Sequence, residues 1–296
     1  MMQHLRIGTR GSPLALVQTE FVANYLRYQG WDVEIRVITT LGDRLADVPV
    51  EQIPERGIFV SALEQALLSG EIDLAVHSLK DLPGQATTGL VLAAIPARED
   101  PRDVLIGRTA PTLETLPAGA VIGTSSQRRR AELLRMRPDI LVVDMRGNID
   151  SRVRKLDEEQ YDAICLAAAG LHRIGLGDRI TQYFDPAALT PAPGQGALAV
   201  QTRADHYELI SLLEGLHDLL TGEATQIERY VLAAIGGGCT SPVGVYVQRK
   251  STGYAVLAAY YSSAGDILSR FSVEMEVGDP QEVGRRIVVL LQRQKA

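Results

Sequence analysis

The fold class of this chain is set by the stretch Leu5-Arg6-Ile7-Gly8-Thr9-Arg10-Gly11-Ser12-Pro13. A short apolar strand runs there into a turn of small residues, and the pattern from Leu14 to Tyr28 is helical. Ser12 can cap that helix, and Pro13 suits its first position. A strand, a tight turn and a helix N-terminus are typical of an α/β sheet and form an anion-binding site. We therefore expect Arg10 and Ser12 to stand at the mouth of such a site.

A second strand, Ile72 to His77, is apolar enough to be buried on both faces and ends at Ser78-Leu79-Lys80-Asp81-Leu82-Pro83. Ligands of open α/β sheets gather beyond the carboxyl ends of the strands. The neighbouring Lys80 and Asp81 are open to two interpretations. They form either a salt bridge within a loop or part of a binding site, where the carboxylate balances a developing cation.

The strand Val121-Ile122-Gly123 precedes Thr124-Ser125-Ser126, which can cap a helix that begins near Gln127. Arg128, Arg129 and Arg130 follow at once, and cations at a helix N-terminus are unfavourable unless an anion neutralises them. From position 128 to 155 the chain has eight Arg and one Lys against four acidic residues. Arginines in this number favour bidentate contacts to carboxylates or phosphates. The alternative is a solvated basic face, which we favour for Arg135 and Arg137.

A glycine-rich loop, Gly236-Gly237-Gly238-Cys239-Thr240-Ser241-Pro242, follows a helix predicted from Thr221 to Ile235. Cys239 lies beyond a helix C-terminus, where the helix dipole does not favour a thiolate. We therefore interpret Cys239 as an anchor that an electrophile alkylates, the alternative being a tight turn with an incidental buried cysteine. Cys165 lies in an apolar strand and is expected to be core.

The composition sets further bounds. The chain has 296 residues, 46% of them hydrophobic and 22% charged, with a net charge of −6. This is typical of a globular protein of two or three domains, and it argues against non-specific binding to nucleic acid or to an anionic membrane. Two cysteines make neither a disulfide framework nor a metal cluster, so no metal is expected. Without an apolar signal core or a membrane-spanning run, we expect a cytoplasmic protein.

Several motifs together resemble one family. They occur in the order seen in hydroxymethylbilane synthases, also called porphobilinogen deaminases, and the match runs nearly end to end. The motifs are Gly8-Thr9-Arg10-Gly11-Ser12-Pro13-Leu14-Ala15-Leu16, His77-Ser78-Leu79-Lys80-Asp81-Leu82-Pro83, Arg98-Glu99-Asp100-Pro101-Arg102-Asp103, Gly123-Thr124-Ser125-Ser126, Arg146-Gly147-Asn148, Pro193-Gly194-Gln195-Gly196 and Gly236-Gly237-Gly238-Cys239.

The resemblance implies an α/β fold with two periplasmic-binding-protein-like (type II) α/β lobes around a cleft and a small C-terminal α+β domain. Domain 1 is then 1–96 with 195–214, domain 2 is 97–194, and domain 3, which carries the cysteine loop, is 215–296. The resemblance also implies an enzyme that condenses four porphobilinogens head to tail with loss of ammonia. Hydrolysis then releases hydroxymethylbilane for porphyrin (haem) biosynthesis. We expect the chain to act as a monomer.

The resemblance further implies a dipyrromethane cofactor held by a thioether to Cys239, with Asp81 as the catalytic carboxylate. By position, the residues that contact the cofactor are Ser78, Lys80, Asp81, Thr124, Ser125, Ser126, Arg128, Arg129, Arg146 and Gly147. Those that contact the substrate are Arg10, Ser12, Phe59, Arg146, Arg152, Arg173 and Gln195. The departures from the family pattern, Leu41 and Arg56, fall in a long polar loop.

Two other classes of protein share some of these features. A two-lobed protein that binds small anions would have the same lobes, but it would need neither Cys239 nor Asp81. A nucleic-acid-binding regulator would use the arginines, but it would need a helix-turn-helix segment, which the sequence lacks, and stacking aromatics, which are missing around the arginines.

Overall fold

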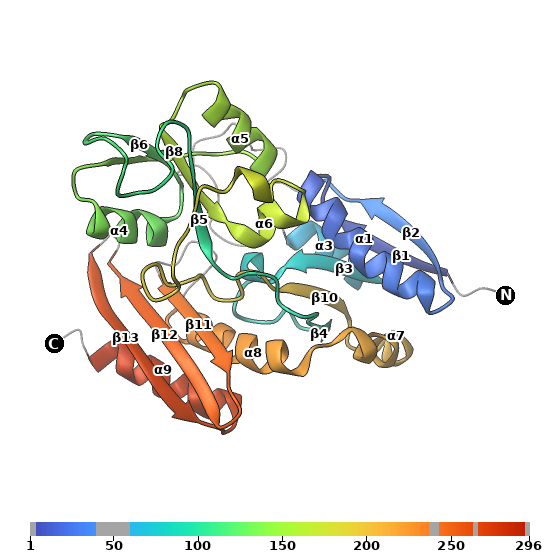
Figure 1. The fold of residues 1–296 in the computed structure, drawn as a ribbon. Coiled ribbons are helices and arrows are strands. Elements are labelled where there is room, and N and C mark those ends of the chain that lie inside the picture. The colour runs from blue at the N-terminus through green and yellow to red at the C-terminus, as the bar shows by residue number, and fades with distance from the viewer. Residues whose placement is uncertain (1–3, 40–59, 237–242, 263–265, 294–296) are drawn as a thin grey trace. The chain divides into compact units, whose positions relative to one another are not determined.

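The structure, a computed structural model, describes residues 4–39, 60–236, 243–262 and 266–293 (Figure 1). The chain divides into two compact units. The first consists of Met1–Arg98 and Ala197–Gly222, and the second of Glu99–Gly196 and Glu223–Ala296. The predicted boundary between domains 2 and 3 falls inside the second unit, and the division into three domains stays a prediction.

The first unit contains a five-stranded mixed sheet. In spatial order its strands are β2 (Asp32–Val37), β1 (His4–Thr9), β3 (Leu74–Ser78), β10 (Leu198–Arg203) and β4 (Leu90–Ala94). β2, β1 and β3 are parallel, whereas β10 runs antiparallel to both of its neighbours. β10, which lies in the stretch 195–214 that was expected to belong to domain 1, therefore returns the chain to the first sheet. The carboxyl ends of β1 and β3 lie at the same edge.

Helices cover both faces of this sheet because alternate strand residues are apolar on both sides. Val76 packs in a cluster with α1 (Pro13–Tyr28) and α7 (Tyr207–Leu213). Its neighbour Ala75 packs in a separate cluster with α3 (Ser61–Leu68). A strand buried on both faces has the continuous apolar sequence that was predicted here.

The second unit contains a sheet with the same topology. Its strands are, in spatial order, β7 (Leu141–Val143), β6 (Val121–Gly123), β8 (Ala163–Ala167), β5 (Asp103–Gly107) and β9 (Gln182–Tyr183). β7, β6 and β8 are parallel, and β5 is antiparallel to β8 and β9. The start of β5 therefore lies at the edge where the parallel strands end. The two sheets confirm the expected pair of α/β lobes.

The helices of this lobe also divide between the two faces. α4 (Gln127–Met136) packs through Leu133 against one face. α5 (Ile149–Asp157) and α6 (Ala168–Arg173) pack against the other. The parallel strands lead directly into these helices, which places each helix N-terminus at the carboxyl edge of the sheet.

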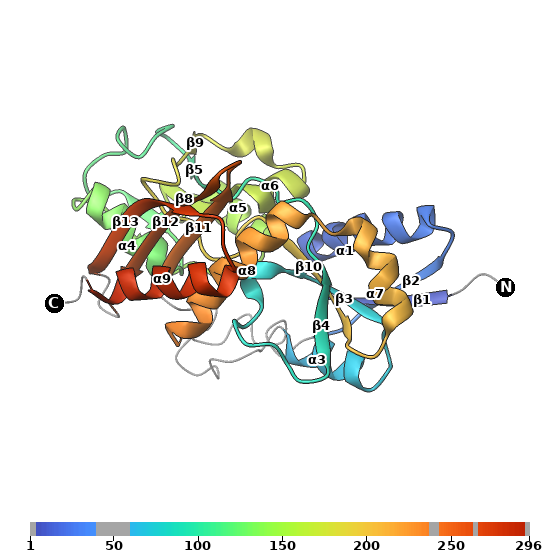
Figure 2. The same cartoon turned by 90° about the horizontal axis from the view of Figure 1, so that it is seen from below.

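The C-terminal part is an antiparallel sheet of β11 (Val243–Arg249), β12 (Gly253–Tyr261) and β13 (Ile267–Glu276). One face packs against α9 (Pro280–Arg293) and the second-unit portion of α8 (Leu219–Ala234), and Figure 2 shows α9 running along the sheet. The opposite face packs on α4. On that face, Ala259 and Tyr261 of β12 form a cluster with Ala131 of α4. This part is the expected small α+β domain.

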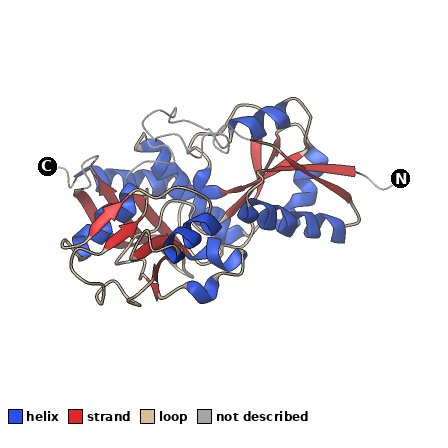
Figure 3. Cartoon of the chain, turned by 90° about the horizontal axis from the view of Figure 1, so that it is seen from above, coloured by secondary structure: helices blue, strands red, loops and turns tan. Residues whose placement is uncertain are grey.

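Figure 3 shows the helices, strands and loops of the chain by colour. The helix predicted over 14–28 forms at Pro13–Tyr28, and the strand predicted over 72–77 forms at Leu74–Ser78. Helix α8 begins at Leu219, two residues before its predicted start. Asp218 caps it, because its carboxylate accepts from the Thr221 backbone N–H at 2.7 Å. Strands β5 and β9 and helix α7 were not predicted. Short 3₁₀ turns occur at Leu79–Asp81, Gly177–Arg179 and Glu214–Leu216. Within the described residues, no helix is long and apolar enough to cross a membrane.

Candidate active site

In the first lobe, the turn after β1 carries Arg10 and Ser12, both half-buried. Ser12 caps α1 as predicted, with its Oγ accepting from the Ala15 backbone N–H at 3.3 Å. The Thr9 hydroxyl donates to the Ala15 carbonyl and closes the turn. The local sequence thus forms a helix N-terminus beside a guanidinium, which favours an anion.

The end of β3 lies at the same edge, because β1 and β3 are parallel neighbours. Gln18 of α1 links the two turns, with its Nε2 donating to Ser78 Oγ at 2.9 Å. The chain then forms the 3₁₀ turn Leu79–Asp81, in which Lys80 is half-buried and the Asp81 side chain is exposed. Five predicted site residues therefore gather at one edge of this lobe: Arg10, Ser12, Ser78, Lys80 and Asp81.

The second lobe has a comparable edge. Ser126 caps α4, with its Oγ accepting from the Arg129 backbone N–H. Ser125 joins this turn to the one after β7, because its Oγ lies 2.7 Å from the Met145 carbonyl and 3.0 Å from the Met145 nitrogen. Thr124 is fully buried and its Oγ accepts from the Ser126 N–H. These hydroxyls make their hydrogen bonds within the turn and fix its shape.

The turn after β7 contains Arg146 and Gly147. Gly147 has φ +111°, and a Cβ added there would lie 3.1 Å from Ser151 Cβ, so a side chain is unfavourable for both conformation and space. The Arg152 guanidinium donates to the Gly147 carbonyl at 2.7 Å, and Lys155 donates to the Arg146 carbonyl at 3.1 Å. Two cations of α5, Arg152 and Lys155, thus bond to the backbone of the turn that carries Arg146.

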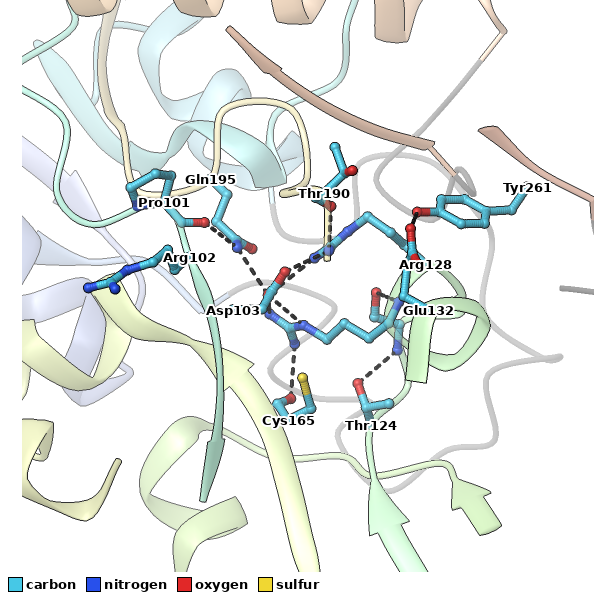
Figure 4. Close-up of polar contacts among 12 residues, drawn as sticks. Pro101, Arg102, Asp103, Thr124, Arg128, Glu132, Cys165, Thr190, Gln195 and Tyr261 are labelled. Atoms are coloured by element: carbon cyan, nitrogen blue, oxygen red, sulfur yellow. Dashed lines mark hydrogen bonds and ion pairs between the residues drawn. The ribbon is translucent and has the colours of Figure 1, made fainter. Parts of the chain in front are cut away.

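Arg128 and Arg129 lie on a single buried carboxylate, that of Asp103 at the start of β5 (Figure 4). Arg128 donates to it at 2.6 and 3.2 Å and to the Thr190 carbonyl at 2.8 Å. Arg129 Nε donates to it at 2.8 Å, and Arg129 NH1 donates to the Cys165 carbonyl at 3.2 Å. Asp103 is completely buried, and the two arginines are only 4% and 7% exposed.

Burial alone would raise the pKa of the Asp103 carboxyl, but the charges of Arg128 and Arg129 outweigh it and lower the pKa from 3.8 to about 2. Asp103 is therefore the internal anion that relieves the conflict between these cations and the helix dipole. The neighbouring Arg130 pairs with a different carboxylate, that of Asp144 at 2.8 Å.

Two further predicted residues lie in the same unit. The Gln195 side chain is fully buried and donates from Nε2 to the Pro101 carbonyl at 2.8 Å and to Asp103 at 3.0 Å. Arg173 is the last residue of α6 and donates to the Gly196 carbonyl at 2.7 Å. Burial lowers the pKa of Arg173, while the charge of Glu99 opposes that shift.

Cys239 and Phe59 lie outside the described residues, so their placement is not tested. Cys165 is buried in β8 as expected, and burial raises the pKa of its thiol to about 12, which makes it unreactive. Arg135 and Arg137, favoured as solvated, pair with Glu132 and Asp139. No group of three or more His, Cys, Asp or Glu residues in the described part of the chain is arranged to hold a metal.

Asp103 is the residue that reasoning from sequence missed. It stands within the motif Arg98-Glu99-Asp100-Pro101-Arg102-Asp103, yet no role was assigned to it. Its signal was an acidic residue at the head of the apolar run Val104-Leu105-Ile106. A charged residue next to a buried strand is expected to have a charged partner.

Two lobes that each carry cations and a helix N-terminus at the carboxyl edge of a sheet define an α/β protein built to bind anions. A family model described as "Porphobilinogen deaminase, dipyromethane cofactor binding domain" matches residues 5–211. A porphobilinogen deaminase from Syntrophobacter fumaroxidans is 43% identical over 285 residues, which are 96% of this chain and 92% of the relative. Another from Geobacillus kaustophilus is 44% identical over 299 residues, covering 100% of this chain and 96% of the relative. The chain belongs to the porphobilinogen deaminase family.

The family is that of hydroxymethylbilane synthases, transferases of tetrapyrrole biosynthesis that act on porphobilinogen and use a dipyrromethane cofactor. This membership does not favour the alternative of a two-lobed small-anion binding protein. A periplasmic substrate-binding protein of an ABC transporter from Coxiella burnetii aligns with 73% of this chain and 93% of its own at 17% identity. The TM-score of that alignment is 0.46, too low to support an inference.

Proposed function

We propose that, in this hydroxymethylbilane synthase, Cys239 is the covalent anchor of the dipyrromethane and Asp81 is the catalytic carboxylate. The observation that carries this proposal is the grouping of Arg10, Ser12, Ser78, Lys80 and Asp81 at one edge of the first sheet. A single edge that presents cations, a helix N-terminus and an exposed carboxylate suits a substrate that carries carboxylates and develops a positive charge.

The residues of the second lobe fit a polycarboxylate. Each porphobilinogen ring has an acetate and a propionate, so a dipyrromethane brings four carboxylates. Guanidiniums and backbone N–H groups at the starts of α4 and α5 are donors for such groups, and each charge-assisted hydrogen bond contributes about 1.5–3 kcal/mol. We assign Arg128, Arg129, Arg146 and Arg152 to these contacts.

When bound, the dipyrromethane supplies the pyrrole carbon to which the first porphobilinogen is joined. The residues of this chain bind and orient the rings through their carboxylates. The role of Asp81 is electrostatic: loss of ammonia from porphobilinogen leaves a cation spread over the ring and its exocyclic methylene. A fixed carboxylate lowers the free energy of that charge and can take part in proton transfer to the leaving amine.

The experiment that tests the anchor is intact-mass measurement of Cys239→Ala beside Cys165→Ala. We expect the first variant to lack the dipyrromethane and to be inactive. The second should carry it in full, because the Cys165 thiol is buried and unreactive. Full loading of Cys239→Ala would show that the anchor lies elsewhere.

The experiment that tests Asp81 is Asp81→Asn, which keeps the shape of the side chain and removes its charge. We expect turnover to fall by ~100-fold or more, the usual scale for losing one preorganised charge-stabilising group. Asp205→Asn is the matched control, since Asp205 is an exposed carboxylate of the same unit that pairs with Arg203. A turnover of Asp81→Asn equal to that of the control would remove Asp81 from the mechanism.

We also propose that the enzyme works as a monomer in the cytoplasm and binds neither nucleic acid nor membranes. The net charge of −6 supports the absence of non-specific binding to polyanions. Sedimentation equilibrium across a range of protein concentrations tests the monomer, and a mass that rises with concentration would contradict it.

A further inference from the structure

Asp103 connects three residues that come from two separate parts of the chain. Its carboxylate accepts from Arg128 and Arg129 of α4 and from Gln195 of the segment before β10. These three side chains are among those assigned to the cofactor or the substrate. A single carboxylate from an antiparallel strand therefore fixes two segments of the second unit.

The hydrogen bonds determine the orientation of both guanidiniums. Arg128 is held between Asp103 and the Thr190 carbonyl, and Arg129 is held between Asp103 and the Cys165 carbonyl. Each planar group thus has partners from two different segments. An arginine side chain has many rotamers, and a guanidinium already fixed in place loses less freedom when a ligand binds.

The charges of this cluster do not cancel. Two guanidiniums share one carboxylate, so the three side chains carry a net positive charge in a buried place. The next acidic residue on α4, Glu132, bonds instead with Tyr261, Arg270 and Arg135. The cluster consequently keeps an excess of positive charge beside the N-terminus of α4, where an anionic ligand is favoured.

We propose that Asp103 is a positioning residue that holds Arg128 and Arg129 in the orientation in which they receive the carboxylates of the dipyrromethane. This inference rests on the proposed function of the two arginines. Asp103 itself does not touch the ligand. It keeps two cations in place while neutralising only part of their charge.

The test compares Asp103→Asn with Asp103→Glu and with Asp162→Asn as control. Asp162 is a half-buried carboxylate at the amino end of β6, where it accepts from the Val121 backbone N–H at 2.8 Å and pairs with Arg108 at 3.3 Å. Among the described residues, the structure shows no bond from it to Arg128 or Arg129. The first readout is the fraction of purified protein that carries the covalent dipyrromethane, by intact mass. The others are the melting temperature and the separate values of KM and kcat for porphobilinogen.

We expect Asp103→Asn to lower the loaded fraction by about 10-fold, the scale seen when a residue that orients a ligand-binding side chain is lost. The loaded remainder should show a raised KM with a kcat closer to that of the wild type. Asp103→Glu keeps the charge but moves it by one methylene, so its loaded fraction should lie between those of Asp103→Asn and the wild type. Asp162→Asn should be fully loaded even where its melting temperature falls.

Three outcomes would overturn the inference. One is full loading of Asp103→Asn while Arg128→Leu loses the dipyrromethane, and in that case the proposed function still stands. Another is an equal loss of loading in Asp103→Asn and Asp162→Asn, since the effect would then be one of stability. The third applies if Asp103→Asn does not fold, and it is full loading of Asp103→Glu. Reduced loading of Asp103→Glu at an unchanged melting temperature would support the inference. Full loading of Arg128→Leu would instead refute the proposed function of the arginine.

Discussion

Glu132 on α4 provides a sharp test of how the second unit is held together. It is completely buried and accepts from Tyr261 Oη at 2.6 Å, from Arg270 at 2.7 Å and from Arg135 at 2.8 Å. Tyr261 and Arg270 belong to the C-terminal sheet, so this one carboxylate joins that sheet to the helix that carries Arg128. We predict that Glu132→Gln destabilises the whole unit.

The magnitude follows from burial. Removing one partner of a buried ion pair costs about 3–5 kcal/mol. The side chains of Arg270 and Arg135 are 25% and 42% exposed and can turn toward water, so we expect the lower end of that range, about 3 kcal/mol. Tyr261→Phe removes a single hydrogen bond to a charged group and should cost about 1.5 kcal/mol. Arg135→Gln removes a partly exposed pair within the helix and should cost ~0.3–0.5 kcal/mol.

Thermal unfolding followed by calorimetry measures these differences. For a unit of 150–250 residues, 1 kcal/mol shifts the melting temperature by about 2–4 °C, so Glu132→Gln should melt about 6–12 °C below the wild type. The expected order of destabilisation is Glu132→Gln, then Tyr261→Phe, then Arg135→Gln. A Glu132→Gln protein with the melting temperature of the wild type, or an Arg135→Gln protein with the lowest melting temperature of the three variants, would refute this account of the network.

Three further predictions concern titration and reactivity. Burial lowers the pKa of His77 from 6.5 to about 4, so the unfolded chain binds a proton below pH 6.5 that the folded chain binds only near pH 4. Stability should therefore fall by about 3 kcal/mol over that interval, and His77→Asn should abolish this slope in urea titrations. The pKa of Asp103 is lowered from 3.8 to about 2, so this group should add about 2 kcal/mol to the free energy of unfolding above pH 3.8. That contribution should be lost as the pH falls through 2, and comparing the unfolding of the wild type with that of Asp103→Asn measures it. Native protein treated with iodoacetamide at pH 8 should leave Cys165 unmodified until urea unfolds it, and alkylation under native conditions would contradict its burial.

Much of the fold was predictable because the relevant signals are local. Ser12 and Ser126 cap the helices that they were expected to cap, and each lies directly after a strand of the parallel set. The apolar sequence of β3 correctly indicated a strand covered on both faces. These features depend on neighbouring residues alone, so a single sequence carries them.

The antiparallel strands were harder to predict, and the set of site residues predicted from sequence lacked Asp103 for the same reason. Ligand-binding residues were sought beyond the carboxyl ends of strands, a rule that applies to parallel strands. β5 runs the opposite way, so its amino end meets the carboxyl ends of β6 and β8. Asp103 stands at that amino end. Only the sheet topology brings it to the turn that holds Arg128 and Arg129, and the sequence does not state that topology.

The charges at the start of α4 illustrate what the sequence could and could not decide. Arginines at a helix N-terminus require an anion, and this reasoning holds in the structure. The sequence did not distinguish an anion within the chain from one on a ligand. The structure supplies one carboxylate for two guanidiniums, and Ser126 has already capped the helix. Asp103 thus accounts for the folding of this turn without a ligand, and the excess positive charge is what our proposal for Arg128 and Arg129 depends on.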